Sequence, residues 1–264
     1  MRSGERRDHI AGLLSTEGSI SVDSLATRLG VTASTIRRDL ARLTEAGTVT
    51  RTYGGAVVSA NRTPESPLHQ RAHEAKAEKD AIGRWAAAQI RDGETVMLDA
   101  GTTVGRVAHH LRGHAELTVI TNGLTSLIEL ADAEEINVVV LGGTLRHISH
   151  GLVGPITDMN LTRFSADRVF LGADGLTADR GICEASPVQT RTKELMAVQG
   201  SAIYVLADSS KIGRAPFNAW APLPGHWTLV TDSAADDEQL APFRALGNVD
   251  VVIVSAPRIH SQVS

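Results

Sequence analysis

The sequence is poor in the features that mark secreted and membrane proteins. It has a single cysteine, Cys183, which excludes an intrachain disulfide and a zinc site built from cysteines. It contains no run of about 18 consecutive apolar residues, which argues against a membrane-spanning helix. The charged start, MRSGERRDHI, leads into no apolar stretch, so we expect no signal peptide. Together these absences predict a soluble cytoplasmic protein.

The usual signatures of nucleotide and metal sites are also missing. Neither the dinucleotide-binding pattern GxGxxG nor the P-loop pattern GxxxxGK[ST] occurs. His109 and His110 share a predicted helix that has no carboxylate at metal-ligand spacing, and His147 and His150 lie in a glycine-rich turn region. We therefore predict neither a metal site nor a cofactor.

The composition supports a folded chain with an uneven charge. Apolar residues make up 42% of the sequence and charged residues 21%, values that favour a packed core over disorder. The net charge of −4 is the sum of +2 over residues 1–57 and −6 over the rest. A mildly basic N-terminal end on an acidic body is compatible with a nucleic-acid contact confined to that end.

Residues 20–39 predict a helix-turn-helix. Ser21 is suited to cap a helix that ends at Gly30, where left-handed backbone is least costly. After a short turn, the Thr32 hydroxyl can cap a second helix, with Thr35 three residues on as a second polar group. Two short helices joined by a tight turn that contains glycine are the arrangement of this motif.

The second helix, within Gly30–Leu43, has two unlike faces. Its apolar residues recur at helical spacing and predict a buried face: Ile36, Leu40 and Leu43. The opposite face and its flanks carry a hydroxyl and positive charge: Ser34, Arg37, Arg38 and Arg42. One face therefore fits a core, and the other fits a polar partner.

A hairpin is predicted directly after this helix. Gly47–Val57 alternates β-prone residues and contains a Gly-Gly turn. As the wing of a helix-turn-helix domain, the hairpin would place Arg51 and Tyr53 on the side where the DNA backbone lies. The helices, the wing and the arginines agree on a DNA-binding domain.

The stretch VTASTIRRDLARLTEAGTVTRTYGGAV resembles the N-terminal signature of the DeoR-type bacterial transcriptional regulators, with its TIRRDL core and its arginine-then-GGA wing. Tyr53 is a departure, since the family more often has histidine there. The resemblance implies that the helix arginines reach phosphates or guanine edges, whereas Asp39 is interpreted as the structural partner of a nearby arginine. The candidates for DNA contact are Thr32, Ser34, Thr35, Arg37, Arg38, Arg42, Arg51 and Tyr53.

A polar segment with two prolines, 58–75, predicts a linker between a DNA-binding domain over 1–57 and a larger domain over 76–264. The larger domain alternates helical periodicity with short apolar runs. The runs predicted as strands are Thr95–Leu98, Leu117–Ile120, Ile136–Leu141, Arg168–Leu171, Ala202–Ala207, Thr228–Thr231 and Val249–Val254. Such a pattern indicates an α/β fold with a mostly parallel sheet covered on both faces.

Polar residues gather where these strands end, which is the edge at which α/β folds bind ligands. Asp99–Thr103 turns from a strand end into a helix start, where free N–H groups favour an anion. Thr121–Gly123 repeats the pattern one strand later, and carboxylates and lysines follow near later strand ends. Hydroxyls and amides for a phosphate, with carboxylates for sugar hydroxyls, suit a phosphorylated polyol.

The motifs DAGTT, TNG, LGG, GADG and LADSSK, in this order, resemble the sensor domain of the same regulators, which is itself similar to ribose-5-phosphate isomerase. The resemblance covers nearly the whole chain and implies a sugar-phosphate effector site rather than an active enzyme. Gly181–Gln189 departs from the acidic run that commonly precedes the lysine. The effector candidates are Asp99, Gly101, Thr102, Thr103, Thr121, Asn122, Gly123, Asp174, Glu184, Lys193, Asp208 and Lys211.

Several functions remain open from the sequence. The leading one is a repressor of a carbohydrate-metabolism operon whose affinity for double-stranded operator DNA changes when a phosphorylated sugar binds. Since helix-turn-helix proteins bind paired half-sites, we expect a homodimer or higher homo-oligomer formed by the larger domain. The alternative is an active aldose–ketose isomerase with an appended N-terminal domain, using Glu184 and Lys193. A third is a DNA-binding oligomer with a vestigial pocket.

Overall fold

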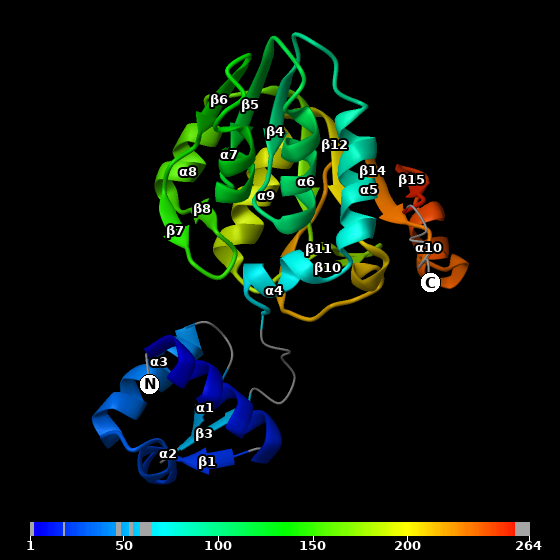
Figure 1. The fold of residues 1–264 in the computed structure, drawn as a ribbon. Helices are drawn as coiled ribbons and strands as arrows, with labels where there is room; N and C mark the ends of the chain where they lie inside the picture. The colour runs from blue at the N-terminus through cyan, green and yellow to red at the C-terminus, as the bar shows by residue number, and fades with distance from the viewer. Residues whose placement is uncertain (1–2, 18, 46–48, 53–54, 59–64, 257–264) are drawn as a thin grey trace, which may run out of the picture. The chain divides into compact units, whose positions relative to one another are not determined.

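The computed structural model describes residues 3–17, 19–45, 49–52, 55–58 and 65–256. The chain divides into two compact units, Met1–Glu65 and Ser66–Ser264 (Figure 1). Each unit has hydrophobic core residues of its own. No helix in the described ranges is long and apolar enough to cross a membrane.

Helices and a small sheet make up the described part of the N-terminal unit. In chain order the elements are α1 (Ser3–Glu17), β1 (Ser19–Ser21), α2 (Val22–Leu29), α3 (Ala33–Glu45), β2 (Val49–Thr52) and β3 (Gly55–Val58). Leu14 of α1, Leu25 of α2 and Ile36 of α3 are fully buried in one core. Leu40 and Leu43 are buried beside them, so the predicted apolar face of α3 is confirmed.

The turn between α2 and α3 is built from the predicted helix signals. The Ser21 hydroxyl accepts a hydrogen bond from the N–H of Ser24 at 3.1 Å and so caps α2. Gly30 ends α2 with a φ of 63°, a left-handed conformation that glycine adopts without strain. The Thr32 hydroxyl accepts from the N–H of Thr35 at 3.2 Å. The predicted helix-turn-helix is confirmed.

β2 and β3 form the predicted hairpin, with Val49 opposite Val58. β3 also pairs with β1, where Ser19 lies opposite Val57, and the sheet order is β1-β3-β2. The sequence does not predict β1, because three residues carry too little periodicity to indicate a strand. The extra strand ties the hairpin to the start of α2.

Seven parallel strands form the central sheet of the larger unit. Listed from one edge to the other, they are β15 (Val249–Val254), β14 (Trp227–Asp232), β12 (Gly200–Leu206), β9 (Ala166–Gly172), β4 (Thr95–Leu98), β5 (Leu117–Thr121) and β6 (Ile136–Val140). Every pairing between them is parallel. Each strand coincides with a predicted apolar run, so the predicted α/β fold is confirmed.

Helices cover both faces of this sheet (Figure 1). One face packs against α5 (Lys76–Ala87), α6 (Thr102–Leu111) and α7 (Leu124–Leu130). The other packs against α8 (Pro155–Leu161), α9 (Pro187–Gln199) and α10 (Asp237–Arg244). Because the carboxyl ends of parallel strands lie at one edge of a sheet, the loops that follow β4, β9 and β12 come together there.

Several short elements around the sheet were not predicted. They are the hairpin of β7 (Thr144–Arg146) and β8 (Gly151–Val153), the small antiparallel sheet of β10 (Gly175–Thr177), β11 (Gly181–Glu184) and β13 (Ala219–Ala221), and the 3-10 turn η1 (Ser209–Lys211). The strands are only three or four residues long, and β13 pairs with a partner distant in sequence, since Cys183 lies opposite Trp220. Local periodicity does not report such pairings.

Helix α4 (Leu68–His73) lies inside the segment 58–75 that the sequence assigns to a linker. The structure differs from that expectation because tertiary contacts hold α4 on the larger unit. Leu68 is buried, and its N–H donates to the carbonyl of Ile148 at 3.0 Å. The composition of the segment carries no sign of these contacts. The larger unit therefore begins at Ser66, before the predicted boundary.

Candidate DNA-binding helix and effector pocket

The polar face of α3 is open to solvent. Thr35 is half-buried, and the other predicted DNA contacts on α3 and just before it are exposed: Thr32, Ser34, Arg37, Arg38 and Arg42. The three arginines have no hydrogen bond or ion pair in the part of the chain that the structure describes. Their guanidinium groups, with five N–H donors each, are therefore available for phosphates and base edges.

Asp39 has the structural role that the sequence predicts. Its carboxylate is buried and accepts a hydrogen bond from Arg6 Nε at 2.6 Å, with Arg7 Nη1 at 4.0 Å. This ion pair joins α1 to α3. A carboxylate used in this way is not available to read a base.

Two predicted DNA contacts belong to the wing. Arg51 lies in β2, opposite Ala56 of β3, and its side chain is not among the described atoms. Tyr53 lies outside the described residues. Both remain predictions.

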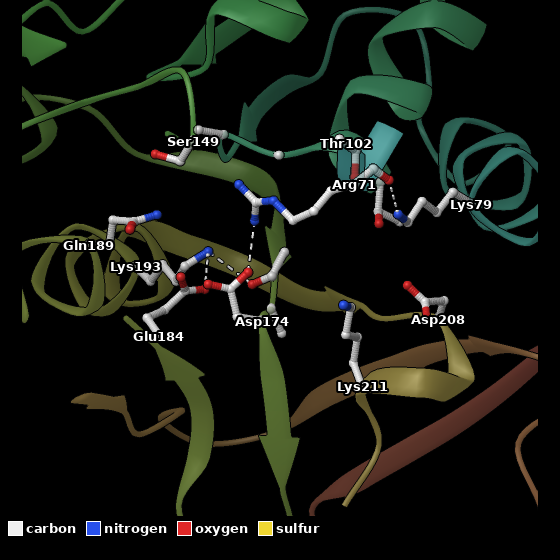
Figure 2. Close-up of a pocket in the computed structure, with 15 residues that line it drawn as sticks. Arg71, Lys79, Thr102, Ser149, Asp174, Glu184, Gln189, Lys193, Asp208 and Lys211 are labelled. Atoms are coloured by element: carbon white, nitrogen blue, oxygen red, sulfur yellow. Dashed lines mark hydrogen bonds and ion pairs between the residues drawn. The ribbon is translucent and has the colours of Figure 1, made fainter. Parts of the chain in front are cut away.

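A pocket opens at the carboxyl edge of the parallel sheet (Figure 2). Its walls come from α4, α5, the start of α6, α9, β11, η1, the loop between β7 and β8, and the loops that follow β4, β9 and β12. The structure brings most of the predicted effector residues to this pocket: Gly101, Thr102, Thr103, Asp174, Glu184, Lys193, Asp208 and Lys211. The structure thus gathers eight of the twelve candidates around one pocket, and their contact with an effector stays a prediction.

Lys193 is the centre of a buried ion cluster at the pocket. Its ammonium donates to the Asp99 carboxylate and to the carbonyl of Gly172 at 2.9 Å, and it lies 3.1 Å from Glu184 Oε1. The three charged residues are each at most 3% exposed. Burial alone would lower the pKa of Lys193, but the two carboxylates outweigh it and raise that pKa above its ordinary value. Lys193 is therefore protonated at neutral pH, with three partners for its three N–H groups.

Asp99 supports the pocket from behind instead of lining it. Its Oδ1 accepts from the N–H of Ala100 at 2.8 Å, and its Oδ2 accepts from the N–H of Gly172 at 3.1 Å as well as from Lys193. The sequence predicts Asp99 as a direct effector contact. The structure gives it structural partners, because α9 brings Lys193 against the end of β4.

The predicted TNG residues also lie outside the pocket lining. The Thr121 hydroxyl donates to the carbonyl of Leu98 at 2.7 Å and accepts from the N–H of Gly123 at 3.0 Å. Asn122 donates through Nδ2 to the carbonyl of Leu152 at 3.1 Å. A Cβ on Gly123 would lie 2.8 Å from Ala100 Cα, so only glycine allows this close approach. These residues join β5 to β4 and to β8, behind the loops that line the pocket.

Three buried polar atoms of residues that line the pocket have no hydrogen-bond partner among the described residues: Ser149 Oγ, Asp174 Oδ2 and Gln189 Oε1. An unsatisfied buried polar atom costs about 1–3 kcal/mol, and native structures contain few of them. Three in one pocket indicate that a polar ligand or ordered water completes the site.

Two lysines lie at the other end of the pocket, where Figure 2 shows Lys79 and Lys211 with the carboxylate of Asp208 beside them. Burial lowers the pKa of Lys79, whose ammonium donates to the carbonyl of Arg71 at 2.6 Å. Lys211 has no hydrogen bond or ion pair within the described ranges. The N-terminus of α6 has Gly101 as its cap and no side-chain cap, so its first N–H groups are free for an anion. This end of the pocket is suited to a phosphate.

Four polar residues that line the pocket are not predicted by the sequence: Arg71, Lys79, Ser149 and Gln189. The first two precede the first strand of the sheet, and Ser149 lies in an unpredicted hairpin, so a rule based on strand ends does not reach them. Gln189 is four residues before Lys193 on α9. Helical spacing from a predicted site residue is the one signal that could have found it.

Each of the two units matches a known protein domain. The DeoR-like helix-turn-helix domain matches residues 6–62, and the DeoR C terminal sensor domain matches residues 74–233. The transcriptional repressor AccR of Agrobacterium fabrum is 35% identical over 230 residues, which cover 87% of this chain and 89% of AccR. The glycerol-3-phosphate regulon repressor of Escherichia coli K12 is 32% identical over 214 residues, covering 81% of this chain and 84% of that protein.

Among solved structures, ribose 5-phosphate isomerase A of Methanocaldococcus jannaschii aligns with a TM-score of 0.39 and 16% identity, over 52% of this chain and 55% of that chain. The two family matches begin within α1 and end at the residue after β14, with residues 63–73 between them unmatched, so they include α3 and the pocket residues other than Arg71. The chain belongs to the DeoR family of helix-turn-helix transcriptional regulators.

Proposed function

We propose that the protein is a repressor of a carbohydrate-metabolism operon and that a phosphorylated sugar or polyol in the pocket controls its affinity for operator DNA. The DNA-binding activity is inferred from membership of the family, and α3 is the helix proposed to enter the major groove. Because such domains read paired half-sites, the proposal includes a homodimer or higher homo-oligomer. It also places the protein in the cytoplasm, with the DNA.

The observation that carries the effector proposal is the division of the pocket into two chemical ends. One end offers the start of α6 with Lys79 and Lys211, which suits a phosphate. The other offers unsatisfied oxygens of Ser149, Asp174 and Gln189, which suit sugar hydroxyls. The E. coli relative takes its name from a phosphorylated polyol, glycerol 3-phosphate, in agreement with this class of ligand.

A thermal-shift screen against glycerol 3-phosphate, ribose 5-phosphate and glucose 6-phosphate tests the proposal, since a ligand that binds only the native state raises Tm. We expect Lys211→Ala to weaken binding of the active compound by about 10- to 100-fold, the effect of removing a charged hydrogen bond. Its Tm without ligand should stay that of wild type, because Lys211 has no ion pair in the described ranges.

Arg112→Ala is the matched control for Lys211→Ala. It also removes one positive charge, but Arg112 is exposed at the opposite end of α6. Ligand affinity in this variant should equal that of wild type. If no phosphorylated sugar or polyol shifts the Tm of the wild-type protein, or if Lys211→Ala binds as tightly as wild type, the assignment of the pocket is wrong.

We further propose that the pocket does not catalyse isomerisation. An aldose–ketose isomerase needs a base that can take a proton from the substrate, and the pocket's Glu184 is held against protonated Lys193. Incubation with pentose and hexose phosphates should therefore yield no isomerised product. Turnover that is lost in Glu184→Gln would reverse this conclusion and favour the enzyme.

A further inference from the structure

A short helix carries the side chain that closes the pocket. Arg71 reaches from α4 across the pocket, and its guanidinium lies between Ser149 and Asp174 (Figure 2). Nη1 donates to Asp174 Oδ1 at 2.8 Å, and Nη2 donates to the carbonyl of Ile148 at 3.4 Å. The Arg71 side chain is 14% exposed and that of Asp174 is 9% exposed, so solvent screens this ion pair weakly.

With Arg71 in this position the pocket has little open space. The cavity volume is about 30 Å³. That is enough for about one water molecule and far below the roughly 300–1,000 Å³ of ordinary ligand pockets. A sugar phosphate can enter only if a lining side chain moves. Lys193 is fixed by two carboxylates inside the unit, whereas Arg71 stands on a helix of only six residues.

The position of α4 depends on groups that line the pocket. The Arg71 guanidinium is bonded to Asp174, and the Arg71 carbonyl accepts from Lys79. Both partners line the pocket. A ligand that binds Asp174 or Lys79 in place of Arg71 therefore removes a contact that fixes the position of α4. α4 is also the first helix of the larger unit, which begins at Ser66, so it directly follows the segment that leads from the DNA-binding unit.

We propose that Arg71 transmits effector binding to α4: the guanidinium leaves Asp174 and binds the effector phosphate at the start of α6, and a sugar hydroxyl donates to the carboxylate that is released. This inference rests on the proposed function. Phosphate accepts two parallel hydrogen bonds from a guanidinium, so the exchange keeps Arg71 fully bonded. Asp174 Oδ2 has no hydrogen-bond partner in the described ranges and can accept from a hydroxyl. α4 then leaves the position that the Arg71–Asp174 pair holds.

The test uses the full chain and measures hydrogen exchange of the α4 amides, residues 68–73, with and without saturating inorganic phosphate or ribose 5-phosphate. In wild type we expect either probe to raise Tm and to change the exchange of α4. In Arg71→Ala the affinity should fall by about 10- to 100-fold, and saturation should no longer change α4 exchange. Asp174→Asn without a probe should already shift α4 exchange toward the saturated wild-type value.

Gln70→Ala is the matched control, because Gln70 is exposed on the same helix and does not line the pocket. It should respond as wild type does. Arg71→Lys keeps the charge but not the paired hydrogen bonds, so it should also bind more weakly and lose the α4 response, which provides a test if Arg71→Ala fails to fold.

Two results would overturn the role of Arg71: an unchanged α4 response in saturated Arg71→Ala or Arg71→Lys, or no α4 response to either probe in wild type. A different result separates this inference from the proposed function. If inorganic phosphate changes α4 exchange through Arg71 while no sugar phosphate binds more tightly than inorganic phosphate, the role of Arg71 stands and the sugar effector does not.

Discussion

Replacing Lys193 with methionine is expected to lower the stability of the larger unit by about 3–5 kcal/mol, the usual effect of removing one partner from a buried ion pair. Asp99 and Glu184 would remain buried without the ammonium that neutralises them. Methionine is long enough to fill the space of the lysine stem, so the loss reports charge and not a cavity. Chemical denaturation measures it.

The triple variant Lys193→Met, Asp99→Asn, Glu184→Gln is the control for this prediction. It removes the uncompensated charges together with the ammonium, and buried ion clusters replaced as a whole often have neutral effects. We expect it to recover most of the stability lost in Lys193→Met. If Lys193→Met were as stable as wild type, the cluster would contribute nothing to folding and the structural position of Asp99 would be wrong.

The stability of wild type and that of Lys193→Met should depend differently on pH. In wild type the raised pKa of Lys193 contributes stability that is fully present below the unfolded-state pKa of about 10.4 and is lost only as the pH rises through the higher folded-state value. This contribution is therefore constant around neutral pH. In Lys193→Met, two like charges oppose each other, so one carboxyl takes up a proton more readily. The stability deficit of the variant should shrink as the pH falls toward 5.

The Lys193 cluster also contains a contact that the sequence does not predict. The apolar runs predicted all strands of the central sheet, since a strand buried on both faces is recognisable from its own residues. The strand-end rule then located the pocket, and Asp99 was placed in it. Its partner Lys193 is 94 residues further along the chain. Because no local pattern reports that α9 turns this lysine toward β4, the sequence does not distinguish a carboxylate that supports the pocket from one that lines it.

Helix α4 was missed for a related reason. Its six residues, LHQRAH, have only one large apolar side chain and no helical periodicity. Isolated helices of this length are unstable in water, so tertiary contacts must hold α4. Those contacts, Leu68 with Ile148 and Arg71 with Asp174, join residues about 80 and 100 positions apart. In contrast, Ser21, Gly30 and Thr32 act on neighbours within a few residues, which is why the helix-turn-helix could be predicted in full.

Replacing Arg38 with alanine is expected to weaken operator binding with little effect on folding. Arg38 is exposed on the polar face of α3 and has no ion pair within the described ranges, so the Tm of the N-terminal unit should not change. One arginine contact to a base edge or phosphate is worth about 1–3 kcal/mol. In a homodimer each copy loses its contact, so the losses add to about 2–6 kcal/mol, a decrease of roughly 30-fold or more.

The measurement is a salt titration of binding to a fragment that the wild-type protein selects from random-sequence DNA. If Arg38 contacts a phosphate, the variant should lose affinity for all sequences and its salt slope should fall by about one per copy. If Arg38 reads a base, specificity should relax at one position of each half-site while the slope changes little. Arg163→Ala, an exposed arginine of the larger unit, controls for net charge. Unchanged affinity of Arg38→Ala at matched salt would contradict the role assigned to the polar face of α3, because Arg38 is nearest the centre of that face.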